Sequence, residues 1–332
     1  MPQKIKNIIR NIIKLTFSIG IILFLIKNGK LDFSLVGRAF ENKKAWISCL
    51  FFLLAQICLS TYRWKKLVEI KSHNKLPFKK VMGLTWIGLF FSSVLPGVVT
   101  GDLVKLVYAR HIDQTLSKTF LLTTILMDRV IGLIGLLCLM GIMSIFSFHE
   151  VTLLAPQMRQ LLFLNFSLFA GVIFFLISLF LPKTIQAKIL TITIKAPLLG
   201  KQINKTLEQV WLIGENTKTI IICFLLSTCS QFFSVLALWT ITSPFYSTKI
   251  SLIHAFTFMP VGFMAMAIPI TPAGLGVGHA IFETLFSFFN VKGGASLFNI
   301  YFISYICINI LGVIPYMFNS AKATEEEIKE FS

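Results

Sequence analysis

Long apolar runs, separated by short polar and mostly basic segments, dominate the chain from end to end. A helix needs about 20 apolar residues to cross the hydrocarbon core of a bilayer, so runs of this length predict spanning helices. Such runs lie near residues 11–27, 45–61, 119–147, 160–181, 218–241 and 297–318. We therefore expect an all-α membrane protein with about six spanning helices.

Two further apolar stretches, near residues 81–109 and 252–290, are interrupted at their centres by the segments LPGVVTGD and IPITPAGLGVGH. Proline lacks an amide proton and glycine frees the backbone, so the helix should unwind at both places. The arms beside each break are short for full spans, which predicts two re-entrant helical hairpins.

The two breaks are candidate parts of a transport pathway. Irregular backbone at membrane depth is tolerated only where it is buried in protein or lines a polar cavity, and a matched pair in two halves of a chain points to a binding site. We assign the unwound backbone to these prolines and glycines: Pro96, Gly97, Gly101, Pro269, Pro272, Gly274 and Gly276.

Basic residues cluster before the first span, between Arg63 and Lys80, and between Lys183 and Lys205, all on one side of the predicted spans. Cytoplasmic loops carry an excess of lysine and arginine, so that side and both termini should be cytoplasmic. The two hairpins then enter the membrane from opposite faces, which is the arrangement of an inverted repeat.

The composition supports a membrane protein. Hydrophobic residues make up 55% of the chain, charged residues 14%, and the mean hydropathy is +0.80. We expect a single transmembrane domain over residues 1–320 and a short charged cytoplasmic tail over 321–332, in a bacterial inner membrane. The six cysteines lie inside apolar runs without the spacing of metal ligands, so we expect no metal and no cofactor.

The net charge of +17 does not indicate a nucleic-acid partner, because the basic residues lie between apolar runs and no nucleic-acid-binding motif accompanies them. They are typical of contacts with anionic lipid, and the stretch from Lys183 to Lys218 is predicted to form an amphipathic surface segment. Phosphate-binding loops, metallohydrolase motifs and nucleophile elbows are missing as well, which favours a transporter over an enzyme.

Asp128 and Arg129 lie about ten residues after Lys118, near the bilayer middle at a rise of ~1.5 Å per residue. Charge at that depth costs at least ~2.5 kcal/mol unless it is paired. Adjacent helical residues diverge by about 100°, so each needs a partner elsewhere. Because a guanidinium forks onto phosphate oxygens, we favour Arg129 as a phosphate-binding residue. An internal brace between helices is the alternative.

Asp102, Lys105 and Arg63 complete, with these two residues, the candidate substrate-binding set. Asp102 follows the first break, where it caps a helix, balances Arg129 or Lys105, or binds a coupled proton or cation. Arg63 and Trp64 together are typical of an anchor at the cytoplasmic interface.

His279 and Glu283 are four residues apart and share a helix face just after the second break. Histidine titrates near neutral pH, so this pair is a candidate for ion coupling. The alternative is that His279 is a packing residue.

Four segments together resemble one family: RW at Arg63, SSVLPGVVTGD ending at Asp102, MDRVIGL from Met127, and PITPAGLGVGH ending at His279. The order and spacing are similar to the lysylphosphatidylglycerol synthase transmembrane-region family, which includes the flippase-like membrane domain of the multiple peptide resistance factor. The resemblance implies lipid translocation between leaflets along a path formed by re-entrant segments. Bifunctional members carry a soluble aminoacyl-transfer domain after the membrane region, and we expect none within these 332 residues.

The leading hypothesis is a translocase for an anionic phospholipid or a polyprenyl-phosphate-linked lipid, driven by an ion gradient, the lipid gradient or a partner. A membrane-embedded lipid head-group transferase, of the phosphatidylglycerol lysyltransferase or glycosyltransferase-associated type, is one alternative. A scaffold for separate lipid-modifying enzymes is the other, and an oligomer is compatible with all three.

Overall fold

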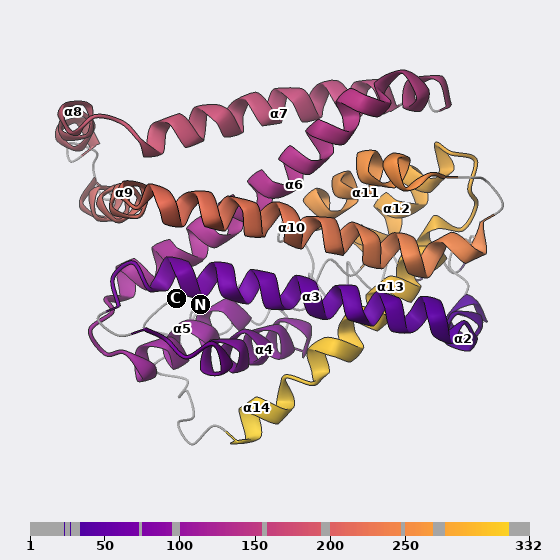
Figure 1. Cartoon of the computed structure of the whole chain (residues 1–332), viewed down its shortest axis with the longest axis horizontal. Coiled ribbons are helices and arrows are strands. Elements are labelled where there is room, and N and C mark those ends of the chain that lie inside the picture. The colour runs from indigo at the N-terminus through magenta and orange to yellow at the C-terminus, as the bar shows by residue number, and fades with distance from the viewer. Residues whose placement is uncertain are drawn as a thin grey trace, which may run out of the picture.

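The computed structural model of the protein describes residues 34–72, 75–94, 100–154, 158–193, 200–246, 250–267 and 276–318, together with Leu23 and Lys27. These residues form helices and no strand (Figure 1). In chain order the helices are α2 (Ser34–Glu41), α3 (Lys43–Val68), α4 (Phe78–Val94), α5 (Thr100–Ile112), α6 (Lys118–Leu154), α7 (Met158–Leu179), α8 (Lys183–Thr193), α9 (Gly200–Glu215), α10 (Thr217–Thr242), η1 (Ser243–Phe245), α11 (Leu252–Ala267), α12 (Val277–Ser287), α13 (Gly294–Ile310) and α14 (Val313–Phe318). The all-α fold is confirmed for this part of the chain.

Within the described residues, five helical segments are long and apolar enough to cross a membrane. They are Lys43–Val68, Lys118–Leu153, Met158–Leu179, Thr217–Phe245 and Gly294–Phe318. Each coincides with a span that hydropathy predicted. The sixth predicted span, near 11–27, and the charged tail fall on residues outside the described ranges, apart from Leu23 and Lys27.

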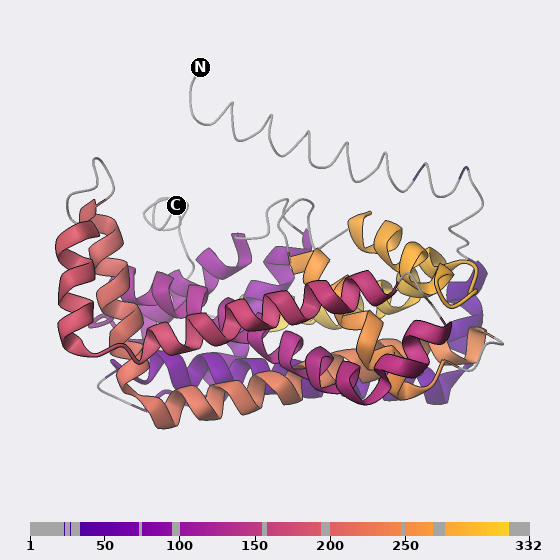
Figure 2. The ribbon, with the colours of Figure 1, turned by 90° about the horizontal axis from the view of Figure 1, so that it is seen from above.

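The two interrupted stretches each form a pair of short helices. In the first, α4 packs against α5, and in the second, α11 packs against α12. The first pair lies toward the end of α3 that carries Val68, and the second lies toward the opposite end of the bundle (Figures 1 and 2). This arrangement fits hairpins that enter from opposite faces, while the inverted repeat itself stays a prediction.

The breaks themselves, 95–99 and 268–275, lie outside the described residues. The backbone assigned to Pro96, Gly97, Pro269, Pro272 and Gly274 is therefore not described. Gly276, directly before α12, has a φ of 81°, a conformation that glycine adopts far more readily than other residues.

Gly101 corrects the sequence prediction, because it lies inside α5 and is helical rather than unwound. Its missing side chain serves a close contact instead: a Cβ at this position would collide with the carbonyl oxygen of Gly88 and the hydroxyl of Ser92 in α4. Small residues allow two membrane helices to approach closely. Gly101 thus holds the arms of the first hairpin together.

Replacing Gly101 with alanine should destabilise this hairpin, because the added methyl group forces α4 and α5 apart. Overpacking of this kind typically costs about 1–3 kcal/mol. Gly171→Ala in α7 is the matched control, since a Cβ at this position would meet no other part of the described chain within 4 Å beyond its own helical turn. Thermal unfolding of the purified proteins measures the difference, and equal melting temperatures for the two variants would contradict the close contact.

The buried side chains form two clusters that correspond to the two ends of the molecule. One gathers Trp64, Tyr108 and Phe120 around the first hairpin, and the other gathers Phe282 and Phe298 around the second. The long helices α3 and α10 run side by side between them (Figure 1). Each hairpin is therefore supported by its own core.

Candidate functional site

The five charged residues predicted to bind substrate come together where α3, α5 and α6 meet. Arg63 comes from α3, Asp102 and Lys105 from α5, and Asp128 and Arg129 from α6. Electrostatic interactions link Lys105 to all four of the others. Three cations and two carboxylates leave this charged cluster with a net charge of +1.

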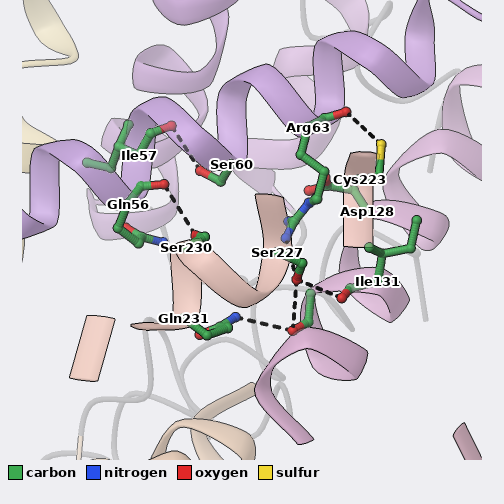
Figure 3. Close-up of polar contacts among 11 residues, drawn as sticks. Gln56, Ile57, Ser60, Arg63, Asp128, Ile131, Cys223, Ser227, Ser230 and Gln231 are labelled. Carbon is green, nitrogen blue, oxygen red and sulfur yellow. Dashed lines mark hydrogen bonds and ion pairs between the residues drawn. The ribbon is translucent and has the colours of Figure 1, made fainter. Parts of the chain in front are cut away.

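Arg63 and Asp128 form a buried ion pair (Figure 3). Arg63 Nε donates to Asp128 Oδ1 at 2.7 Å, and Nη1 donates to Ser227 Oγ of α10 at 3.0 Å. The thiol of Cys223 contacts the backbone carbonyl oxygen of Arg63 at 3.6 Å. The two charged side chains are only 7% and 18% exposed. The pair therefore joins α3, α6 and α10 inside the protein.

This burial corrects the expectation for Arg63 and Trp64. Both are buried, with exposed fractions of 6% and 1%, so neither anchors α3 in the lipid interface. Both side chains are buried because of tertiary contacts. Trp64 belongs to the core around the first hairpin, and Arg63 points inward to form its ion pair with Asp128.

Arg129 and Asp102 form a second ion pair of a different kind. Arg129 Nε and Nη2 both donate to Oδ2 of Asp102, at 3.1 Å and 2.5 Å. The side chains are 40% and 28% exposed, so solvent or a ligand reaches them. The expectation that Asp128 and Arg129 take partners on other helices is confirmed, and the second partner lies in the first hairpin.

Lys105 is the third cation of the cluster. It is buried, and its Nζ lies 3.7 Å from the centroid of the Trp64 ring. An aromatic face attracts a cation within about 6 Å, which compensates in part for the loss of water. A positive charge is thereby held beside the Asp102–Arg129 pair.

Several polar residues of the site were not singled out by sequence reasoning. The Ser227 hydroxyl accepts from Arg63 and donates to the carbonyl of Ile131 at 2.7 Å, and Gln231 Nε2 donates to the carbonyl of Gly132 at 3.2 Å (Figure 3). The signal available was the run STCSQ inside an apolar span, in which Ser227 and Gln231 are four residues apart and share a face.

Helix α13 adds a polar stripe next to the charged cluster. Tyr305 interacts electrostatically with Asp102. Asn309 Nδ2 donates to Ser93 Oγ of α4 at 3.0 Å. Tyr301, one turn before Tyr305, stacks its ring on it with an interplanar angle of 11°. The C-terminal part of α13 is therefore bonded to the first hairpin.

The other end of α13 is bonded to the second hairpin through the predicted ion-coupling residues. His279 Nε2 lies 3.1 Å from Asn299 Oδ1, and Glu283 Oε2 accepts from the backbone N–H of Ala295 at 3.0 Å. The His279 ring packs edge-on against Phe298. These contacts give both residues structural partners on α13, and their role in ion coupling stays a prediction.

Comparison with known proteins agrees with this architecture. The family model described as the lysylphosphatidylglycerol synthase TM region matches residues 11–312, which include both hairpins and the whole charged cluster. A search of curated proteins finds no match. The chain is thus an integral membrane protein that belongs to the lysylphosphatidylglycerol synthase transmembrane-region family, as its motifs indicated.

Proposed function

We propose that this protein is a lipid translocase, which moves a phospholipid or a lipid-linked anionic head group between the leaflets of a bacterial inner membrane. Membership of the family supports interaction with membrane lipids. The observation that carries the proposal is the half-exposed Arg129–Asp102 pair, held beside the additional cation Lys105.

The two ion pairs differ in how easily a ligand can separate them. Arg63 binds Asp128 and Ser227 at once inside the protein, and a ligand that displaced it would leave a nearly buried carboxylate without its counter-charge. Such a loss is strongly unfavourable. Arg129 is 40% exposed and its partner 28%, so separation exposes both groups to water or lipid head groups at small cost.

A lipid phosphate fits this site by geometry and by charge. Arginine presents parallel N–H donors that match two phosphate oxygens, so a phosphate competes with Asp102 for the same edge of Arg129. The cluster carries a net +1, and a phosphodiester with one negative charge neutralises it. The acyl chains remain in the hydrocarbon while the head group moves past the charged cluster.

The lysine clusters predict that both termini lie in the cytoplasm, and the proposal adopts this orientation of the protein. The first hairpin then serves the cytoplasmic leaflet and the second the outer leaflet. Because each hairpin is hydrogen-bonded to one end of α13, a movement of one can be transmitted to the other. The driving force is an ion gradient, the lipid gradient itself or a partner.

A dithionite assay tests the proposal. Purified protein is placed in liposomes with fluorescent phosphatidylglycerol in both leaflets, and dithionite is added outside. A translocase should allow nearly all of the label to be bleached, whereas empty liposomes keep the label of the inner leaflet. If the label in the inner leaflet stays protected from dithionite although the protein is folded, the proposal is contradicted. Chemical conversion of the lipid without movement would identify a transferase instead, and native mass spectrometry of copurified lipid would name the substrate.

A further inference from the structure

Helices α8 and α9 form a helical hairpin outside the main bundle. Their axes run roughly perpendicular to α7 and α10, and the hairpin lies across the ends of these two helices (Figures 1 and 2). If α7 and α10 span the membrane, α8 and α9 lie parallel to its plane, at the end where the lysine-rich segments predict the cytoplasm.

The hairpin is fixed to the bundle by specific contacts. Trp211 Nε1 of α9 donates to the carbonyl of Ser178 in α7 at 3.1 Å. Asn204 Nδ2 donates to the carbonyl of Leu190, which joins α9 to α8 at 3.0 Å. A Cβ at Gly214 would collide with the carbonyl of Leu179, so α9 and α7 are in close contact. The hairpin therefore presents a defined surface.

That surface combines exposed isoleucines with lysines. Ile185 and Ile192, which lie on one face of α8 together with Ile189, are 42% and 69% exposed, and no residue of α8 is buried. The exposed lysines of the hairpin are Lys183, Lys188, Lys201 and Lys205. Four lysines against two glutamates give α8 and α9 a net charge of +2.

We propose that the α8–α9 hairpin docks on the cytoplasmic leaflet of the same membrane as an amphipathic element that selects anionic lipid. The isoleucine face enters the boundary between head groups and acyl chains, while the lysines reach the lipid phosphates. An amphipathic helix with lysine on its polar side binds in this way. Each lysine near an anionic surface contributes about 1 kcal/mol.

Charge and position favour lipid over a soluble protein partner. The hairpin lies at the ends of α7 and α10, which are candidate spans, so lipid head groups are within reach of it without any further component (Figure 2). Lysine side chains can bury their alkyl stems and keep the ammonium group in water, as suits a membrane boundary.

Cysteine labelling tests the docking. Ile192→Cys on the apolar face and Thr191→Cys on the adjacent polar face are both exposed in the isolated chain. The full-length proteins are placed in nanodiscs that contain either phosphatidylglycerol or only phosphatidylcholine, and a membrane-impermeant maleimide is added. Wild-type protein measures the background from the native cysteines. In detergent the two variants should react at similar rates.

In phosphatidylglycerol nanodiscs, Ile192→Cys should react at least about ten times more slowly than Thr191→Cys, because the lysines of the hairpin hold this face against the lipid. Adding Lys188→Gln, Lys201→Gln and Lys205→Gln should restore its labelling, and phosphatidylcholine nanodiscs should do the same. Lys43→Gln with Lys44→Gln, which removes two lysines at the N-terminal end of α3, is the control and should change nothing. Equal rates for Ile192→Cys and Thr191→Cys in anionic nanodiscs would overturn the proposal, and so would protection that appears only when cytosolic protein is added.

Discussion

Arg129→Ala should reduce lipid translocation by on the order of 100-fold or more, while Arg129→Lys should retain part of the rate. Two charge-assisted hydrogen bonds to a phosphate are lost in the alanine variant, each worth about 1.5–3 kcal/mol. Lysine keeps the positive charge but not the fork of donors. The measurement is the dithionite rate in liposomes with labelled phosphatidylglycerol.

The stability of the Arg129→Ala protein should change little, by about 0–1 kcal/mol, because the pair with Asp102 is partly exposed. Arg159→Ala is the matched control, since Arg159 is an exposed arginine of α7 that contacts the ring of Phe163 and lies outside the charged cluster. It should translocate lipid at the wild-type rate. Full activity in a well-folded Arg129→Ala protein would remove Arg129 from the pathway.

Hydropathy was sufficient to predict the five spans that the structure describes and the position of the two hairpins, because the bilayer imposes the length of each apolar run. The same physics predicted that Asp128 and Arg129 need separate partners, since neighbouring residues on a helix point apart. Which residues those partners are depends on tertiary packing. Arg63 was predicted to lie at the interface, and only the approach of α3 to α6 turns its guanidinium inward to Asp128.

Ser227 shows why the rest of the site was not predictable. Serine in a membrane helix commonly bonds the carbonyl four residues earlier, as Ser144 does with Met140 and Ser234 with Ser230. Ser227 instead donates to Ile131 of α6 and accepts from Arg63 of α3. All three serines lie within apolar helical sequence, so the sequence around Ser227 does not distinguish it from the other two. The difference arises from Gly135, whose missing side chain allows α6 to contact α10 at Ser227.

Helix α13 connects the two hairpins through hydrogen bonds at both of its ends. Asn299 bonds His279 of the second hairpin and Asn309 bonds Ser93 of the first, ten residues further along the same helix. Glycines permit close contacts near both ends, since a Cβ at Gly294 or at Gly312 would collide with backbone carbonyl oxygens of α12 and α4. A helix held in this way transmits displacement as a rigid body.

Asp128→Asn should destabilise the protein far more than Asp102→Asn, although both changes remove one carboxylate from the same cluster. Arg63 is buried, and in Asp128→Asn its charge keeps only uncharged side-chain partners, the introduced amide and the hydroxyl of Ser227. Removing one member of a buried ion pair costs about 3–5 kcal/mol. Arg129 is 40% exposed and gains water when Asp102 is neutralised, so that change should cost about 0–1 kcal/mol. Thermal unfolding of the purified variants compares the two.

A double variant separates the charge from the loss of contact. Replacing Arg63 and Asp128 together with leucine removes both charges, and well-packed apolar replacements of buried ion pairs are often neutral or stabilising. The double variant should therefore be more stable than Asp128→Asn alone, even though it lacks more hydrogen bonds. The translocation rate of the double variant then shows whether the buried pair does more than connect three helices. If the rate is normal, Arg63 and Asp128 have a structural role. Arg129 and Lys105 are then the residues that bind the head group. Equal stability of Asp128→Asn and Asp102→Asn would show instead that water reaches Arg63, and the distinction between a bracing pair and a binding pair would be wrong.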